Sequence, residues 1–365
     1  IGGGALVPTL GGAAPPPTLP SETPQQLLAD MVQAKPPALS GAISWTSNLG
    51  LSDLSTVEDE LGQSGDSSSA SVAGIDPLSF LSGSYQFDVW LGSQAEHIAF
   101  SPSDAEEADL VRNGNQVWSW DSTTSTVTHF IFEAPGGAAQ AAAASSSDAA
   151  TLTPQQLADR LLQHLGPTTS VTTGTPLYVA GQPAYQLIFA PKAATGTTVD
   201  HIEVDLGSNG SLLGAPLAVA VYSLGQSAPA IELAFTGSLN LGEPPASELT
   251  FAPPPGAQVV THVEPGRGVG AGAGATTAPG SAGNLGLGKT GSGWLTVISG
   301  QDQELANTVS NPELSGLTSV VTVGGQPARL LSTDLLNVLI MPDGHFYAGL
   351  VTPSALEAAA APAGT

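Results

Sequence analysis

The closest match to a chemical motif is Gly283–Thr290 (GNLGLGKT), which has the spacing G-x-x-x-x-G-K-[ST]. In that motif backbone amides and a lysine hold the phosphates of a nucleotide. A working phosphate loop lies between a buried strand and a helix whose N-terminus faces the phosphates. Here the motif sits in a Gly/Ala-rich stretch and runs into Gly291–Gly293 (GSG). This context argues against nucleotide binding.

A second group of chemically capable residues is the segment Asp200–Asp205 (DHIEVD). On a strand, His201, Glu203 and Asp205 project from one face, and three ligand types on one face could hold a metal. The residues between them are apolar, however. The simplest interpretation is therefore the solvent face of a sheet strand, with a metal site as the alternative.

Other chemistry finds less support. The acidic run Asp104–Asp109 (DAEEAD) lacks the spacing and the glycine of an EF-hand loop, so we interpret it as solvated charge rather than a calcium site. The sequence has no G-x-S-x-G elbow, no Ser-x-x-Lys and no carboxylate pair framed by apolar residues. We therefore predict no catalytic residues, no metal, no cofactor and no enzymatic activity.

Composition narrows the class of partner. The chain has 365 residues, with 7 Lys+Arg against 31 Asp+Glu, a net charge of −24. Such a chain offers no basic patch for phosphates, so nucleic acid and anionic membrane surfaces are poor partners. Only 10% of residues are charged, Gly (44) and Pro (30) are abundant and Cys is absent, which excludes disulfides and thiolate sites.

The start of the chain suggests export. Residue 1 is Ile, and Ile1–Leu10 reads like the end of an apolar segment that runs into the Pro-rich Ala13–Pro20. We expect a removed signal peptide or signal anchor, with an arbitrary boundary of the sequence as the alternative. The predicted location is extracytoplasmic, either secreted or tethered by a missing N-terminal segment.

Hydrophobic periodicity predicts the elements. Ser21–Pro24 opens a helix, which Pro36-Pro37 ends, and Thr153–Leu165 forms a second one. Period-two alternation predicts antiparallel strands in two sets. The first set covers about 39–49, 85–91, 95–100, 107–112, 116–121 and 126–132. The second set covers about 169–173, 176–181, 184–190, 198–206, 216–224, 229–237 and 248–251.

These elements give a predicted domain plan. Residues 1–21 form a disordered leader, 22–262 the main β-rich domain with a low-complexity insertion at 134–151, 263–293 a flexible Gly/Ala linker, and 294–362 a small C-terminal α+β segment. In that last segment we expect about four strands and a final helix at Pro353–Ala360. The fold class is α+β and mainly antiparallel β.

Apolar surface is the remaining functional signal. Trp118 and Trp120 share one face of a strand, Trp45 lies on another strand, and Leu217–Tyr222 is apolar on both faces. A strand that is apolar on both faces is buried on both. One interpretation is an ordinary core with helices packed inside a curved sheet. The other is a sheet that curls around an apolar cavity suited to an acyl chain.

Several long segments resemble a known family. Leu27–Leu54, Phe80–Gly92 and Asp109–Phe130, followed by Pro183–Pro191 and Val204–Val221, are similar in order and spacing to the actinobacterial branch of the LolA/RseB-like superfamily, the lipoprotein carriers and envelope-stress regulators. The resemblance covers about residues 22–260. It implies a curved antiparallel half-barrel whose helices close the concave face, an apolar cavity for lipid, and no enzymatic activity. The carriers' cavity arginine has no clear counterpart, since Arg112 lies beside a hairpin.

On this resemblance we predict a monomeric binding protein that holds the acyl chains of a lipid or acylated protein. The residues expected to line the cavity are Trp45, Phe87, Val89, Trp118, Trp120, Ile188, Leu217 and Val219. The alternative is an RseB-like regulatory module that docks on a membrane-associated envelope protein such as an anti-sigma factor. That alternative requires the tail to form a defined second domain with an exposed apolar or acidic face. A purely structural protein with a filled barrel is the third possibility.

Overall fold

The structure is a computed structural model that describes residues 15–50, 81–103, 106–132, 162, 165–193, 195–264, 287–303, 306 and 318–361. The predicted insertion at 134–151, and nearly all of the predicted helix Thr153–Leu165, lie outside these residues. Within them, no helix is long and apolar enough to cross a membrane.

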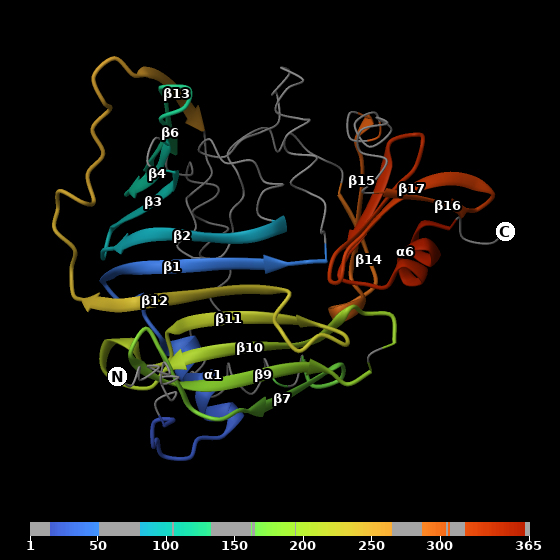
Figure 1. The fold of residues 1–365 in the computed structure, drawn as a ribbon, viewed down its shortest axis with the longest axis horizontal. Coiled ribbons are helices and arrows are strands. Elements are labelled where there is room, and N and C mark those ends of the chain that lie inside the picture. Colours follow the sequence, from blue (N-terminus) through green and yellow to red (C-terminus); the bar gives the residue numbers. More distant parts are fainter. Residues whose placement is uncertain are drawn as a thin grey trace, which may run out of the picture.

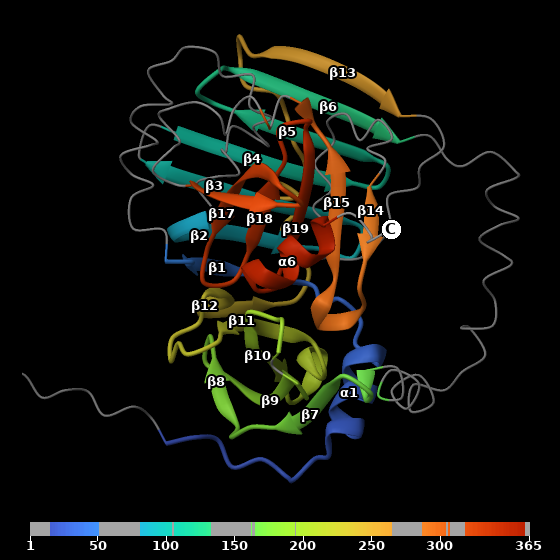
Figure 2. The ribbon, with the colours of Figure 1, turned by 90° about the vertical axis from the view of Figure 1, so that its right-hand side faces the viewer.

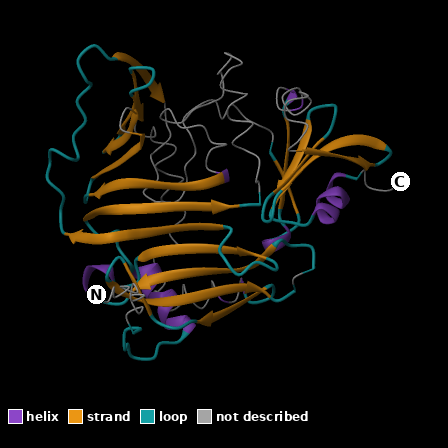
Figure 3. Ribbon diagram, viewed as in Figure 1, coloured by secondary structure: helices purple, strands orange, loops and turns teal. Residues whose placement is uncertain are grey.

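One large open sheet dominates the fold (Figures 1 and 3). Its strands are β1 (Leu39–Asn48), β2 (Ser82–Leu91), β3 (Ala95–Ser103), β4 (Glu106–Asn113), β5 (Gln116–Asp121), β6 (Thr126–Phe132), β7 (Thr169–Thr173), β8 (Leu177–Val179), β9 (Gln182–Pro191), β10 (Val199–Gly207), β11 (Pro216–Ser223), β12 (Ile231–Leu241) and β13 (Gln258–Glu264). The order is β13-β6-β5-β4-β3-β2-β1-β12-β11-β10-β9-β7, and β8 pairs with β9. Both predicted sets of strands are therefore confirmed, with one exception, as parts of a single sheet.

The joint between the two sets is the antiparallel pair β1–β12. It aligns Leu39 with Leu241 and Trp45 with Leu233, and a bulge interrupts the register between Ser40 and Ala42. On its other side β1 pairs with β2 along its whole length. Because β1 holds a strand on each edge, it is the central strand that makes one sheet from two meanders.

The exception is the strand predicted at 248–251, which is wrong. Residues 246–249 form turns, with Glu248 N donating to Pro245 O and Leu249 N to Ala246 O. Prolines at 244, 245 and 253–255 lack the amide that a sheet ladder needs. The last strand is instead β13, which pairs parallel with β6 at the edge of the sheet.

The helix α1 (Pro24–Gln33) forms where it is predicted. Thr23 and Gln26 make a capping box, and Pro24 stands at the first helical turn, where its missing amide costs nothing. Leu27 and Leu28 are buried in a cluster with Leu187, which faces the same side of the sheet as Phe189 and Val204. The open sheet thus carries α1 on one face near its β7–β9 end (Figure 2).

The tail forms a second sheet. Its strands are β14 (Gly288–Thr290), β15 (Val297–Gln301), β16 (Thr318–Val323), β17 (Gln326–Ser332), β18 (Asn337–Ile340) and β19 (His345–Gly349), in the order β14-β15-β19-β18-β17-β16. The predicted segment 294–362 contains five strands where about four were expected, the sixth strand β14 lies within the predicted linker 263–293, and α6 (Pro353–Ala360) has the predicted bounds. Leu330, Leu339 and Leu356 form the centre of a separate core between this sheet and α6.

The two sheets are joined through backbone and core. Thr197 and Val351 form an antiparallel bridge, and Asp334 N donates to Leu49 O across the same junction. Leu335 is 1% exposed and packs in a cluster of first-sheet residues that includes Val199. A contact with both hydrogen-bond pairing and apolar burial fixes the second domain to the end of the first sheet.

We expect Leu335→Ala to destabilise both sheets together by about 2–5 kcal/mol, because it leaves a cavity at their junction. Leu224→Ala is the matched control, since Leu224 is 41% exposed and its truncation costs about 0.5 kcal/mol or less. Guanidinium unfolding followed by circular dichroism measures both. Equal effects of the two substitutions would show that the junction contributes nothing to stability.

Candidate functional site

The strand register assigns each side chain to one of two faces of the large sheet. We call the side on which α1 packs the helix face; Leu187 and Phe189 lie on it. The opposite side is crossed by residues 242–257, which we call the strap, and we name it the strap face. Trp118 marks it, because its ring stacks on Phe251 of the strap at 5.7 Å.

The eight residues predicted to line one cavity fall on both faces. Trp45, Phe87, Val89, Leu217 and Val219 share the helix face, and Trp118, Trp120 and Ile188 share the strap face. Val89 and Leu217 are 2% exposed and Trp120 is 7% exposed. The sheet therefore separates the set into two groups, and ligand binding by either group stays a prediction.

On the helix face one of the predicted residues, Phe87, lies in an aromatic cluster. Phe87 stacks on Phe100 at 4.9 Å between ring centroids, and Tyr85 meets Phe100 edge-on at 5.7 Å. Leu233, directly across from Trp45, is 40% exposed. Such a cluster offers rigid apolar contact area, the property that acyl chains and apolar side chains of a partner both require.

Arg112 also lies on the helix face, where it pairs with Glu96. Its Nη2 donates to Oε1 at 2.6 Å and its Nε to Oε2 at 3.1 Å, a bidentate pair that raises the pKa of Arg112. The position is partly exposed, with a relative accessibility of 25% for the side chain. The guanidinium is thus already engaged within its own hairpin.

The segment DHIEVD contributes a polar cluster to the strap face. His201, Glu203 and Asp205 project from one side of β10, as predicted, and their neighbours on β9 and β11 complete the group. Gln186 Nε2 donates to Glu203 Oε2 and to Asp205 Oδ1, both at 3.2 Å. Tyr222 OH also donates to Glu203 Oε2 at 3.2 Å. Side chains from three adjacent strands therefore share one hydrogen-bond network.

Burial changes the acidity of this network. It raises the pKa of Asp205 to about 6, against the hydrogen bond from Gln186 and together with the charges of Glu203 and Glu232. Burial and Glu203 likewise raise the pKa of Tyr222 to about 12. Asp205 is only 8% exposed, so an ionised carboxylate there has little solvent to compensate its charge.

The other candidate sites gain nothing from the structure. In the described part of the chain, no three His, Cys, Asp or Glu side chains are grouped so that they could hold a metal, which leaves the DHIEVD alternative without support. Gly288–Thr290 of the phosphate-loop match forms strand β14, and a short 3₁₀ turn and another strand follow it. A phosphate-binding helix N-terminus is therefore missing from this position.

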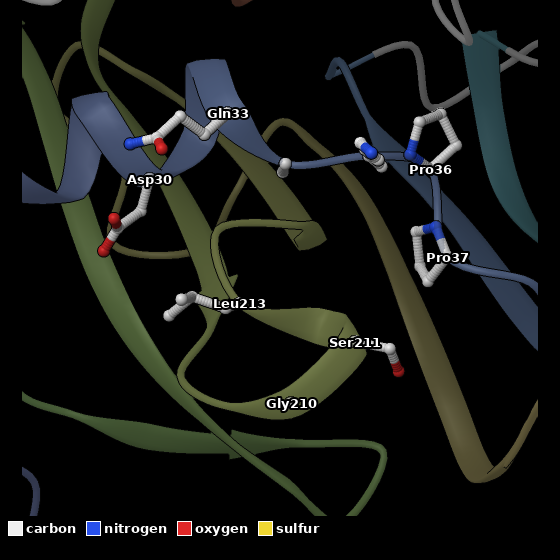
Figure 4. Close-up of a pocket in the computed structure, with 9 residues that line it drawn as sticks. Asp30, Gln33, Pro36, Pro37, Gly210, Ser211 and Leu213 are labelled. Carbon is white, nitrogen blue, oxygen red and sulfur yellow. The ribbon is translucent and has the colours of Figure 1, made fainter. Parts of the chain in front are cut away.

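A hollow lies at the C-terminal end of α1 (Figure 4). It has a volume of about 400 Å³ and is open to solvent. Asp30 and Gln33 of α1 line it, opposite Ser211 and Leu213. Gly214 permits this approach, because a Cβ there would lie 2.2 Å from Asp30 O. Its lining is mixed in polarity, with Lys35 as a further charged residue and Pro36 and Pro37 as apolar ones.

Sequence reasoning missed the strap and the residues that hold it. His97 on β3 contacts both Asp109 on β4 and the Glu248 carbonyl of the strap. The sequence pattern places Asp109 in a solvated acidic run, whereas its side chain is 13% exposed. The available signal was the density of prolines in 244–255, which argues against a strand and for an irregular crossing segment.

Comparison with known proteins adds structural likeness at low identity. No protein-family model matches the chain, and neither does any curated protein. The complex of Pseudomonas aeruginosa MucA/MucB matches with 15% identity and a TM-score of 0.42, over 93% of this chain and 96% of that one. MucB in complex with MucA(peri) matches with 14% identity and a TM-score of 0.43, over 93% and 96%. An uncharacterised conserved protein from Thermus thermophilus gives 10% identity and a TM-score of 0.34, over 65% and 98%.

Membership of the LolA/RseB-like superfamily, and of its actinobacterial branch, stays a prediction from the sequence.

The raised pKa of Asp205 makes a prediction with a definite sign. The folded state binds this proton more tightly than the unfolded state, whose carboxyl titrates near 3.8. The contribution of the Asp205 proton to the free energy of unfolding is therefore fully present below pH 3.8. It is lost as the pH rises through about 6, and the total loss is roughly 3 kcal/mol. Asp205→Asn, which mimics the protonated form, should be more stable than wild type at about pH 7.5 and similar at about pH 4 in guanidinium unfolding.

Asp121→Asn is the control of opposite sign. Burial raises the pKa of Asp121, but hydrogen bonds from Thr123 and Thr124 outweigh it and lower the pKa overall. This substitution should destabilise the protein at about pH 7.5. A wild-type-like stability of Asp205→Asn at both pH values would refute the burial argument.

Proposed function

We propose that the chain is an extracytoplasmic, non-enzymatic protein that binds an envelope protein in the manner of an RseB-like regulatory module. The observation that carries the proposal is the second domain. A regulatory module of this kind requires the tail to form a defined domain with an exposed apolar or acidic face. The tail has its own six-stranded sheet and its own core, and the Thr197–Val351 bridge fixes it to the first sheet.

Exposed apolar side chains on this domain support a docking role. Val320 is 63% exposed and Ile298 is 46% exposed, and the register places both on the face opposite the core beneath α6. Val320 lies on β16, an edge strand with β17 on one side and no paired strand on the other among the described residues. An edge strand of this kind can accept an extended segment of a partner by strand addition.

Charge limits the partner further. With a net charge of −24 and only 7 basic residues, the chain favours a partner whose contact surface is basic or neutral. Across the second sheet Arg329 pairs with Val320, and Lys289 pairs with Ile298. Arg329 thus stands beside Val320 and donates to Thr318 Oγ1 on β16, whereas Lys289 lies on β14 at the opposite edge of the sheet.

A photo-crosslinking amino acid at position 320 tests this proposal in the full chain. We expect it to capture one envelope protein, and the same probe at Leu213, 44% exposed on the first domain, to capture none. Val320→Glu should weaken binding of that protein about tenfold or more, measured by titration with the purified partner. Equal capture at both positions, or unchanged affinity of the variant, would contradict docking through β16.

Lipid binding is the second candidate, and the aromatic cluster of the helix face favours it. Burying an acyl chain yields about 0.8 kcal/mol per CH₂ before ordering costs. Native mass spectrometry with lipid extraction tests it, with Trp45→Ser on the helix face matched against Trp118→Ser on the strap face. Loss of a copurified lipid in Trp45→Ser alone would assign lipid binding to the helix face. If the wild-type protein carries no lipid mass, the lipid-binding role is excluded.

A further inference from the structure

The strap crosses the sheet without joining it. Among the described residues, its backbone-to-backbone hydrogen bonds with the rest of the chain lie at its two ends, where Gly242 N donates to Ala38 O and Gln258 N, just after the strap, donates to Ser125 O. Between them, the backbone hydrogen bonds of the strap are local turns, such as Leu249 N to Ala246 O. The middle of the strap is thus held by side-chain contacts rather than by a strand ladder.

Those contacts are few and specific. Glu243 accepts hydrogen bonds from Ser93 N at 3.0 Å and from Ser93 Oγ at 3.2 Å. Leu249 is 7% exposed and lies so close to Gly92 that a Cβ there would be 2.7 Å from its Cδ1. Phe251 stacks on Trp118, whose other neighbour is the parallel ring of His129 at 3.5 Å.

The remaining contact requires a particular protonation state. His97 Nδ1 lies 2.8 Å from the Glu248 carbonyl oxygen, and its Nε2 lies 3.0 Å from Asp109 Oδ1. Both atoms opposite the ring are acceptors when Asp109 is ionised, so both hydrogen bonds exist only if both ring nitrogens carry a proton. The neutral ring has one proton and can satisfy one acceptor.

We propose that residues 242–257 form a strap that the doubly protonated His97 locks onto the sheet, and that loss of one imidazole proton releases the middle of the strap. The neutral ring keeps its proton either on Nδ1, facing Glu248 O of the strap, or on Nε2, facing the Asp109 carboxylate. Because these two acceptors compete for one proton, the hydrogen bond to the strap weakens. The lock rests on the strap geometry and does not depend on the proposed function.

The surroundings of His97 favour the cation. Burial lowers the pKa of His97, but the hydrogen bond and charge of Asp109, with the Glu248 carbonyl and carboxylate, outweigh it and raise the pKa overall. From β2, Trp90 stacks on the ring at 4.7 Å, a placement that suits a cation over an aromatic face. The charges that act on the ring are those of Asp109 on β4 and Glu248 on the strap, and the other titratable groups on this face of β2 and on the strap, Asp88 and Glu243, are acidic as well.

Hydrogen exchange of the strap tests the lock in the full chain. We expect the amides of 242–258 to exchange roughly tenfold faster at about pH 9 than at about pH 6, after correction for intrinsic rates. His97→Gln should show the fast rate at both pH values. His345→Gln is the matched control, because His345 pairs with Asp343 in the second domain and lies far along the chain from the strap.

Asp109→Asn separates the lock from general destabilisation. Its amide can donate to Nε2 while a neutral His97 still donates from Nδ1 to Glu248 O, so both bonds survive without the second proton. We expect slow exchange of the strap at both pH values in this variant. A wild-type strap whose exchange is independent of pH, or an Asp109→Asn strap that keeps the wild-type pH dependence, would overturn the proposal; circular dichroism checks the fold of each variant.

Discussion

The pairing of β1 with β12 is the constraint on which the rest of the structure depends. Ser44 Oγ reaches the Ala234 carbonyl across this pair, and the two residues are 190 positions apart in the chain. Without it the chain would have two separate meanders, each with an open edge. With it, one register runs from β13 to β7 and fixes which side chains share the helix face and which share the strap face. Pairing of such distant segments is also slow to form, because loop closure precedes the contacts that reward it.

This dependence explains what could be predicted from the sequence. Alternation within one strand is visible locally, so β5, β6 and β7 have their predicted bounds and His201, Glu203 and Asp205 share a face as expected. The relation between strands is not local. Whether Trp45 and Trp118 share a face depends on the parity of every register step between β1 and β5, and one residue of slip inverts it. Sequence patterns contain no information on that parity. The eight residues predicted to line one cavity are therefore split between the two faces of the sheet.

The polar cluster and the strap illustrate the same limit. Gln186 and Tyr222 join Glu203 and Asp205 only because β9 and β11 flank β10, and the charge of Glu232 acts on Asp205 from β12, one strand further along; nothing in the spacing of these residues predicts the network. The strap could not be predicted for a different reason. Its short run LTF at 249–251 has the local pattern of a strand, but the prolines on either side prevent the hydrogen-bond ladder that a strand requires.

The parallel pairing of β13 with β6 has a consequence for solubility. β6 carries a nearly uncharged run, TVTHFIF, of the kind that joins readily to foreign strands when its edge is open. β13 covers that edge, and the strap delivers β13 to it from the opposite half of the sheet. By placing β13 on β6, the prolines and turns of 242–257 therefore oppose the pairing of β6 with strands of other molecules. A chain truncated before residue 258 would present β6 as a bare template for aggregation.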